Sequence, residues 1–522
     1  MPDSSRLRQA TVACVGGIAR LFAAATTLTI AVDGVVYVRQ ARLLDAGQIK
    51  QALAIPYHIG YAACVCAVHR LLFLANTPEG WELAAQVVSL IAGFATIFVV
   101  WKIGEEVFGK EAGFWCGLAA ALNVQLVRFS AQVRSEALFL LLLGGAILFA
   151  IRFLKRQTVW NATLCGLLTA LAYFVRPEAL LVGVLFSAFC IVLLFAGLLK
   201  RAEGKWRYAV GLGALAGIVI LCVLPHIYAI RPFGGVGKEK GRLKLTLKRD
   251  PFWLFRRHLA ERDYVATEEG VERRYVLPRS RLKNFLMAYA SDIGEGAHIL
   301  ASRVLHPVLA LLVLLGLVGL LAGGEHHRGG TWFLLLGAVS YFLLVSLFGV
   351  THRHLTQPAL FLLPLCGVGV VWLKERLSRR RKLLWFLGIV AAGLLLGRLA
   401  VVRHSGYLAE RQAGLFLRQT VPPYYRIACR LPRLVYYSDL TCVGEIQAPK
   451  GERYRIRRRK LEMLLKKGCE LVAVDAAPLS PEDRNYILKH KHLAVLARFR
   501  VPPQDIIVLR VLPSSQKRQP NR

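Results

Sequence analysis

Residues 178–199 read EALLVGVLFSAFCIVLLFAGLL, and apart from Glu178 this run contains no charged side chain. A helix of this length crosses a hydrocarbon core of roughly 30 Å, and its own backbone must satisfy every N–H and C=O group that lipid cannot. The whole chain is similarly apolar, with 55% hydrophobic residues among 522 and a mean hydropathy of +0.47. We expect eleven spans, at residues 11–32, 82–101, 112–128, 136–154, 159–175, 178–199, 208–229, 298–322, 331–350, 355–373 and 383–401.

Basic loops indicate which side of the membrane each end faces. Short loops rich in Lys and Arg stay in the cytoplasm, and the runs at 155–156, 200–207 and 374–382 fall on one side of an eleven-span arrangement. The N-terminus is therefore expected in the cytoplasm, and the C-terminal segment is expected on the extracytoplasmic side of the cell (inner) membrane. Residues 57–74 are nearly long enough to span, but they contain His58, His69 and Arg70. Because charge near a bilayer centre is costly, we expect a helix in the outer interface there.

The net charge of +36 is larger than loop orientation explains. A basic excess remains in residues 231–297 and 403–522, which are expected outside. Two interpretations stay open: a surface resting on anionic lipid headgroups, or a funnel for a phosphate-bearing substrate. Neither interpretation calls for nucleic acid as a partner.

The composition changes after Val402 to short apolar runs separated by polar turns. Residues 433–437, 470–474 and 506–512 resemble strands, and residues 455–467 and 481–490 resemble helices. The expected fold is thus an all-α polytopic membrane domain (1–402) with outer loops 33–81 and 231–297, followed by a small extracytoplasmic α/β domain (403–522). Any two of Cys429, Cys442 and Cys469 could form a disulfide there.

Polar and ionisable residues gather in the expected outer loops. They are Asp33, Tyr37, His58, Arg134, Glu136, Arg176, Glu178, His352 and Arg353. Ionisable groups at membrane depth are functional candidates, but several also have a structural interpretation. Glu136 and Glu178 could favour helix N-termini, and residues 352–354 could extend to headgroups. Asp33 at the end of the first span would oppose the helix dipole, so a functional role is expected for it.

A carboxylate beside several cations suits transfer of a group from a lipid phosphate. The carboxylate takes the proton of an acceptor hydroxyl, and the cations stabilise the departing phosphate. Because phosphate is a weakly basic leaving group, a second acid is not needed, unlike in glycoside hydrolysis. The Asp, Glu and His residues show no ligand spacing, so a divalent metal is not supported.

The first outer loop, DGVVYVRQARLLDAGQIKQAL…PYHIGYAACVCAVHRLL (33–72), resembles that of GT-C glycosyltransferases. The similar branch contains protein O-mannosyltransferases and lipid A aminoarabinose transferases. The resemblance rests on Asp33, Tyr37, Ala41, Gly47 and the HIGYA segment at 58–62, and on RSE at 134–136, RPE at 176–178, RHL at 353–355 and the run 415–439. This chain has Ile59 and Ala62 in place of two family prolines, and Gly34 in place of a second acid.

The resemblance implies inverting transfer of a hexose or pentose from a polyprenyl-phosphate donor to a lipid, glycan or protein hydroxyl at the outer face. It implies that Asp33 is the general base and that His58 contacts the donor phosphate. Arg176 and Arg353 would be supporting phosphate contacts or structural contacts. The supporting residues would be Tyr37, Arg134, Glu136, Glu178 and His352.

Two other functions are compatible with a polytopic chain. A lipid or solute transporter or flippase would place polar groups near the midplane, often in repeated halves, whereas these spans are apolar through their centres. A structural subunit would leave Asp33 unexplained. Loop 231–297 could be a lid over the site, or a lipid-facing anchor through Phe252, Trp253 and Phe255.

Overall fold

The computed structural model describes residues 4–55, 57–199, 204–230, 261–267, 270–276, 281–322, 327–348, 351–399, 407–447 and 455–512. Most of loop 231–297, including the aromatic residues at 252–255, lies outside the described residues. The chain divides into two compact units. The membrane unit comprises Met1–Ala24, Gln40–Val68 and Ala85–Val401, and the tail unit comprises Ala25–Arg39, His69–Ala84 and Val402–Arg522.

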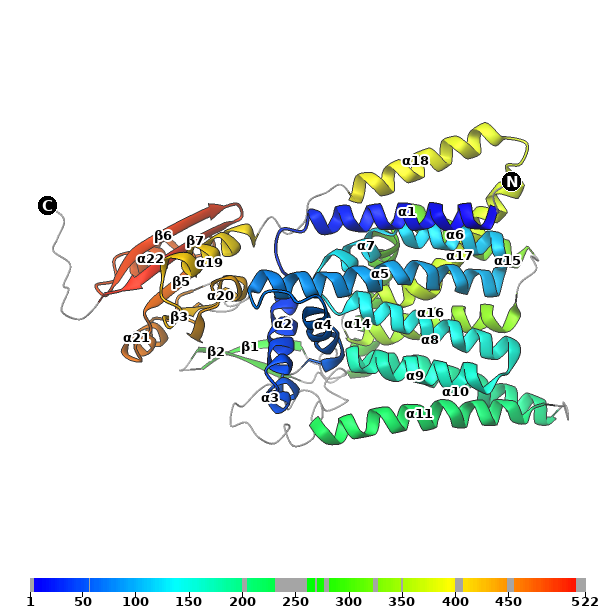
Figure 1. The fold of residues 1–522 in the computed structure, drawn as a ribbon, viewed down its shortest axis with the longest axis horizontal. Coiled ribbons are helices and arrows are strands. Elements are labelled where there is room, and N and C mark those ends of the chain that lie inside the picture. Colours follow the sequence, from blue (N-terminus) through cyan, green and yellow to red (C-terminus); the bar gives the residue numbers. More distant parts are fainter. Residues whose placement is uncertain are drawn as a thin grey trace. The chain divides into compact units, whose positions relative to one another are not determined.

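The membrane unit is a bundle in which the long helices run nearly parallel or antiparallel to one another (Figure 1). The helices from the N-terminus to residue 399 are α1 (Ser4–Ala25), α2 (Val32–Asp45), α3 (Ile49–Ala54), α4 (Ile59–Leu71), α5 (Pro78–Phe108), α6 (Lys110–Leu122), α7 (Val124–Ala131), α8 (Glu136–Arg156), α9 (Val159–Val175), η1 (Pro177–Ala179), α10 (Leu180–Leu199), α11 (Trp206–Ile230), α14 (Arg281–Ile299), the π-helix η3 (Leu300–Leu305), α15 (Pro307–Leu321), α16 (Arg328–Phe348), α17 (Thr356–Arg376) and α18 (Arg381–Leu399). Strands β1 (Glu261–Thr267) and β2 (Gly270–Val276) pair antiparallel.

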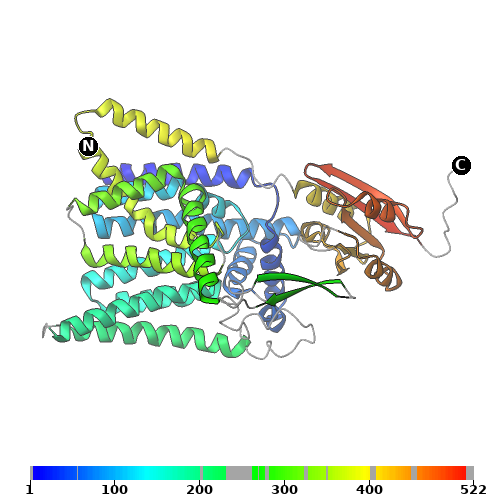
Figure 2. The same ribbon diagram turned by 180° about the vertical axis from the view of Figure 1, so that it is seen from behind.

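Among the described residues, six helices are long and apolar enough to cross a membrane, or eight if each of two bent pairs counts as one span. One pair is α6 with α7, bent by 55°, and the other joins residues 289–305 to α15 with a bend of 109°. Figure 2 shows α14 steeply inclined to the bundle. Each expected span coincides with a helix or a bent pair, so a multi-pass membrane protein is confirmed, while the count of eleven stays a prediction.

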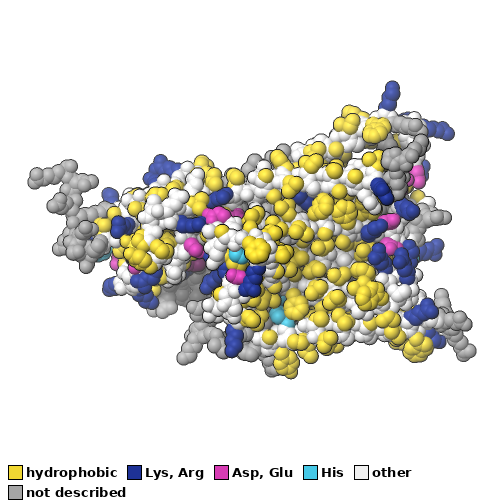
Figure 3. Space-filling model, in the orientation of Figure 1, with side chains coloured by type: hydrophobic (Ala, Val, Ile, Leu, Met, Phe, Trp, Pro, Cys, Tyr) yellow, Lys and Arg dark blue, Asp and Glu magenta, His cyan; other side chains and the backbone are white. Residues whose placement is uncertain are grey.

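The surface of the bundle matches a lipid environment. A broad belt of hydrophobic side chains covers its middle, and Lys and Arg gather at the end that carries the N-terminus (Figure 3). Small residues bring helix backbones together, as expected where lipid competes for apolar contacts. A Cβ added at Gly316 of α15 would lie 2.2 Å from the carbonyl oxygen of Leu365, and one at Gly369 of α17 would lie 2.1 Å from that of Leu312.

The tail unit contains a five-stranded sheet in the order β4-β3-β5-β7-β6, parallel between β4, β3 and β5 and antiparallel elsewhere. Its elements are α19 (Leu408–Thr420), β3 (Arg426–Cys429), α20 (Pro432–Ser438), β4 (Thr441–Gly444), α21 (Arg458–Lys466), β5 (Leu471–Asp475), α22 (Pro481–Leu488), β6 (Leu493–Val501) and β7 (Gln504–Val511). The expected fold class, a helical membrane domain followed by a small α/β domain, is confirmed.

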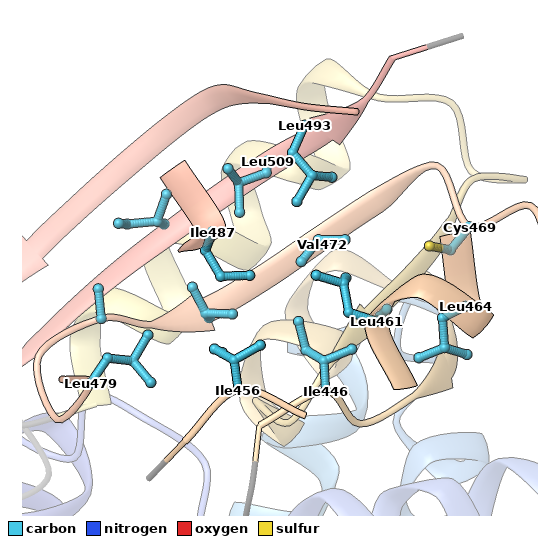
Figure 4. Close-up of a cluster of buried hydrophobic side chains, with 14 residues drawn as sticks. Ile446, Ile456, Leu461, Leu464, Cys469, Val472, Leu479, Ile487, Leu493 and Leu509 are labelled. Atoms are coloured by element: carbon cyan, nitrogen blue, oxygen red, sulfur yellow. The ribbon is translucent and has the colours of Figure 1, made fainter. Parts of the chain in front are cut away.

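Helices cover both faces of this sheet, because successive side chains of the buried strands point to opposite faces and both sets are apolar. Leu471 and Ala473 of β5 pack in the cluster that contains residues of α19 and α20. Val472 and Val474 pack on the other face with residues of α21 and α22 (Figure 4). Ser480 begins α22, because its hydroxyl accepts a hydrogen bond from the N–H of Asp483 at 3.2 Å.

Two expectations for the chain need correction, and one open question is answered. Residues 433–437 form part of α20 rather than a strand, because Pro432 occupies the first turn of a helix. Cys429, Cys442 and Cys469, for which a disulfide was left open, are all free thiols. The first helix ends at Ala25 rather than at residue 32.

Candidate active site

A buried carboxylate joins three outer turns of the membrane unit. Glu136 is the first residue of α8, and its side chain is only 3% exposed. Its Oε1 lies 3.4 Å from Nη1 of Arg176, which follows the last residue of α9. The same carboxylate also pairs with Arg353, which lies in the turn before α17. The RSE, RPE and RHL segments of the sequence therefore meet at one end of the bundle.

Glu178 adds a second carboxylate to this cluster. Its Oε1 accepts a hydrogen bond from Nη2 of Arg176 at 3.1 Å, and its backbone carbonyl accepts one from the Tyr341 hydroxyl at 3.0 Å. The other oxygens, Oε2 of Glu136 and Oε2 of Glu178, are buried with no hydrogen-bond partner among the described residues. Because a buried acceptor without a partner is costly, these oxygens are suited to accept hydrogen bonds from hydroxyl groups of a ligand.

The structural interpretation of these turns also holds. Pro177 starts the short helix η1, and Glu136 and Glu178 stand in first helical turns, where a carboxylate favours the helix dipole. However, helix capping does not require burial of the carboxylates against arginines. Removing charges from water is expensive, so stability alone does not explain this cluster.

His58 lies just before α4, beside the same cluster. Its ring makes an edge contact with Tyr173 at 5.2 Å between centroids, and the ring of His226 is 5.9 Å away. Burial lowers the pKa of His58 to about 4, helped by His226 and Arg176, although Glu178 acts in the opposite direction. The lowered pKa favours the neutral imidazole at neutral pH, which has one N–H to donate and carries no positive charge.

Further basic residues surround the cluster. The charge of Arg134 acts on Glu136, and that of His354 acts on Glu178. Burial lowers the pKa of His352, and the neighbouring Arg134 and Arg128 lower it further. Tyr173, His226 and Tyr341 were not predicted as site residues, because nothing in their local sequence separates them from ordinary residues of apolar helices.

Asp33 and Tyr37 belong to the tail unit. Asp33 stands in the first turn of α2, not at the end of the preceding helix. A carboxylate there favours the helix dipole, so the prediction that Asp33 opposes a helix dipole is wrong. Tyr37 is buried, with 4% of its surface exposed.

Residues of the tail unit hold the backbone just before Asp33. The Ile30 N–H donates to the Tyr437 hydroxyl at 3.1 Å, and the Ile30 carbonyl accepts from Nε of Arg433 at 2.7 Å. The hydroxyl of Tyr437 also lies 3.1 Å from the carboxylate of Glu82. The entry to α2 is thus fixed by buried polar groups of the C-terminal α/β domain.

No group of three or more His, Cys, Asp or Glu side chains suited to a metal ion is found within the parts of the chain that the structure describes. The arginines, carboxylates and histidines of the cluster can supply hydrogen bonds and charge stabilisation.

Comparison with known proteins identifies the fold. The family model of dolichyl-phosphate-mannose-protein mannosyltransferases matches residues 75–228. ArnT from Cupriavidus metallidurans in the apo state is similar, with a TM-score of 0.59 and 13% identity over 96% of this chain and 97% of that chain. The same enzyme bound to undecaprenyl phosphate gives 0.57 and 13%, with the same coverage.

A third similar structure is the archaeal oligosaccharyltransferase AglB from Archaeoglobus fulgidus in complex with an inhibitory peptide and a dolichol-phosphate. Its TM-score is 0.56 at 11% identity, over 90% of this chain and 69% of that chain. No curated protein sequence matches this chain. Together, the family model and these structures confirm the GT-C fold that the first outer loop predicted.

Proposed function

We propose that this chain, which has the GT-C fold, is a glycosyltransferase that uses a polyprenyl-phosphate sugar as donor. The sugar passes to a hydroxyl of a lipid, glycan or protein acceptor. The observation that carries the proposal is the buried cluster of Glu136, Glu178, Arg176 and Arg353 at one end of the bundle. A membrane-embedded site with arginines and free carboxylate oxygens is suited to bind both the phosphate and the hydroxyls of such a donor.

The proposed reaction inverts the configuration of the sugar. A carboxylate accepts the proton of the acceptor hydroxyl, whose oxygen attacks the anomeric carbon as the bond to the phosphate oxygen breaks. The electron pair of that bond leaves with polyprenyl phosphate. We assign the base to Asp33, on the resemblance of the first outer loop.

The departing phosphate gains negative charge during the reaction. Arg176 and Arg353 are the proposed contacts that stabilise this charge, because both guanidinium groups lie in the cluster beside the carboxylate of Glu136. Neutral His58 donates a single hydrogen bond. Arg134, Glu136, Glu178 and His352 orient these contacts, and Tyr37, buried one turn after Asp33 on α2, supports the helix position of the base.

We place the site at the extracytoplasmic face of the cell membrane, with the N-terminus in the cytoplasm and the α/β domain outside. The basic end of the bundle, which carries the N-terminus (Figure 3), supports this orientation, since basic residues remain on the cytoplasmic side. The structures of similar proteins hold undecaprenyl phosphate or a dolichol-phosphate, which supports a polyprenyl-phosphate donor for this chain.

A donor panel tests the proposal. The purified full-length protein would be given polyprenyl phosphates carrying different hexoses and pentoses, with membrane extract as acceptor, and the release of polyprenyl phosphate would be measured. At least one sugar should turn over, with the sugar recovered on the acceptor. A flippase would instead move intact donor across a proteoliposome membrane without releasing the sugar, and that result would contradict the proposal.

A further inference from the structure

Two neighbouring residues of α4 fix this helix against the rest of the membrane unit. They are Gly60 and Tyr61, which follow closely on His58 and have no part in the reaction proposed above. A Cβ added at Gly60 would lie 2.7 Å from the carbonyl oxygen of Phe174, which is two residues before Arg176. Because backbone atoms cannot move aside, only glycine lets the start of α4 lie directly against the end of α9.

Tyr61 joins α4 to α5 by buried hydrogen bonds. Its side chain is fully buried, and its hydroxyl lies 2.9 Å from the carbonyl oxygen of Ala85 and 2.9 Å from Oγ of Ser89. Ser89, which is fully buried as well, donates to the carbonyl oxygen of Arg134 at 3.3 Å. Arg134 lies in the turn that leads into α8. The contacts therefore run from α4, through α5, to the turn just before Glu136.

Three contacts share the two hydroxyl protons of this group. A tyrosine or serine hydroxyl donates one hydrogen bond and can accept others. When Ser89 donates to the Arg134 carbonyl, the proton of Tyr61 must lie between the two hydroxyl oxygens, because these would otherwise face each other at 2.9 Å without a hydrogen. In the resulting chain, from Tyr61 to Ser89 to Arg134, each hydrogen bond polarises and strengthens the next.

A purely structural role is the alternative for these hydroxyls, since hydroxyl groups also hold membrane helices together. Thr96 of α5 is a useful contrast, because its buried hydroxyl donates to the carbonyl of Ala92 in the same helix. The hydroxyls of Tyr61 and Ser89 instead join α4, α5 and the turn before α8. Phenylalanine and alanine would pack at these positions without the cost of burying a hydroxyl, so packing alone does not explain them.

We propose that Tyr61 and Ser89 are positioning residues, which set the distance between His58 and the Glu136 cluster. Gly60 completes the arrangement, because it holds the same helix against the end of α9. The donor contacts on separate elements are thus held in one geometry before the donor binds, which lowers the cost of reaching the transition state. This role rests on the sugar transfer proposed above.

The kinetics of sugar transfer test this role, measured on the full-length protein with the donor that the panel identifies. Tyr61→Phe and Ser89→Ala should each lower kcat about ten- to a hundredfold, because the donor contacts no longer match the transition state. The KM for the donor should change by less than about threefold, since the contacts themselves remain. The double variant should be no slower than the slower single variant, because loss of either hydroxyl breaks the same chain.

Thr96→Val is the matched control, because it removes a buried hydroxyl of α5 that bonds its own helix, and its kcat should stay close to that of the wild type. Thermal unfolding in detergent shows which variants are folded, and either single variant decides the test if the other is unfolded. Folded variants with the kcat of Thr96→Val would overturn the positioning role, as would a change confined to KM or multiplied effects in the double variant. A wild type that turns over no donor would overturn the proposed function together with this role, so the two failures are distinguishable.

Discussion

Nε of Arg433 donates a 2.7 Å hydrogen bond to the carbonyl oxygen of Ile30, just before the helix that carries Asp33. The guanidinium is also paired with Glu410 at 3.6 Å, and both side chains are at most 5% exposed. Buried polar groups of this kind fix one geometry, because any displacement leaves them without partners. We infer that the α/β domain positions Asp33.

Tyr437→Phe tests this positioning role. The variant loses the hydroxyl that contacts the Ile30 N–H and the Glu82 carboxylate. We expect the kcat of sugar transfer to fall about ten- to a hundredfold through misplacement of the base, with little change in KM for the donor. Tyr436→Phe is the matched control, because its hydroxyl bonds the Pro78 carbonyl instead. Equal effects of the two variants would show a structural role only.

The ion pair of Glu136 and Arg353 should be strongly coupled because Glu136 is buried. A double-mutant cycle with Glu136→Gln and Arg353→Gln, read by thermal unfolding in detergent, should give a coupling of about 1–3 kcal/mol. The exposed pair of Glu79 and Arg418, with side chains 43% and 34% exposed, should give less than about 1 kcal/mol. Similar values for both pairs would contradict the account of the cluster.

His58 should make stability depend on pH. Burial lowers its pKa in the folded chain to about 4, whereas the unfolded chain has a value near 6.5. Between these two pKa values the unfolded chain binds more protons than the folded chain. The contribution of the neutral, buried imidazole to stability is therefore complete above about pH 6.5 and is lost as the pH falls toward 4. From pH 7 to 5 the wild type should lose about 2 kcal/mol more than His58→Gln, measured as free energies of unfolding. An equal loss of unfolding free energy in the wild type and in His58→Gln would contradict this prediction.

Cys442 offers a test of sidedness. It is an exposed free thiol, and a hydrogen bond with Cys429 lowers the pKa of its thiol, which favours the reactive thiolate. A membrane-impermeant maleimide should therefore label the wild type on intact cells. The Cys442→Ser variant should lose that label. Labelling that requires permeabilised cells would place the α/β domain in the cytoplasm and contradict the proposed orientation.

Local patterns predicted most of the fold. Apolar runs such as 178–199 identified the helices, because lipid leaves no other way to satisfy the backbone. The strand predicted at 470–474 is β5, and the helix predicted at 481–490 contains α22. The segment 433–437 was misread because aromatic and β-branched residues favour strands locally, whereas Pro432 and packing against α19 produce a helix.

The site was predictable only in part. Arg176, Glu136 and Arg353 fall at helix ends, so the alternating direction of the spans brings them to one end of the bundle. Tyr61 and Ser89 lie within apolar runs, and the contacts that join them to Arg134 have no distinct sequence signal. The end of α1 was placed too late because the apolar run continues past Ala25, which also produced the mistaken dipole argument for Asp33.

The role of Asp33 as general base is tested by the rate of a single turnover with the donor that the panel identifies. Wild type, Asp33→Asn and the control Asp45→Asn, at the other end of α2, would be compared at saturating donor and acceptor. Asp33→Asn should bind the donor normally but transfer sugar about 10²- to 10⁴-fold more slowly, while Asp45→Asn should stay close to wild type. Transfer at the wild-type rate by Asp33→Asn would show that Asp33 is not the base.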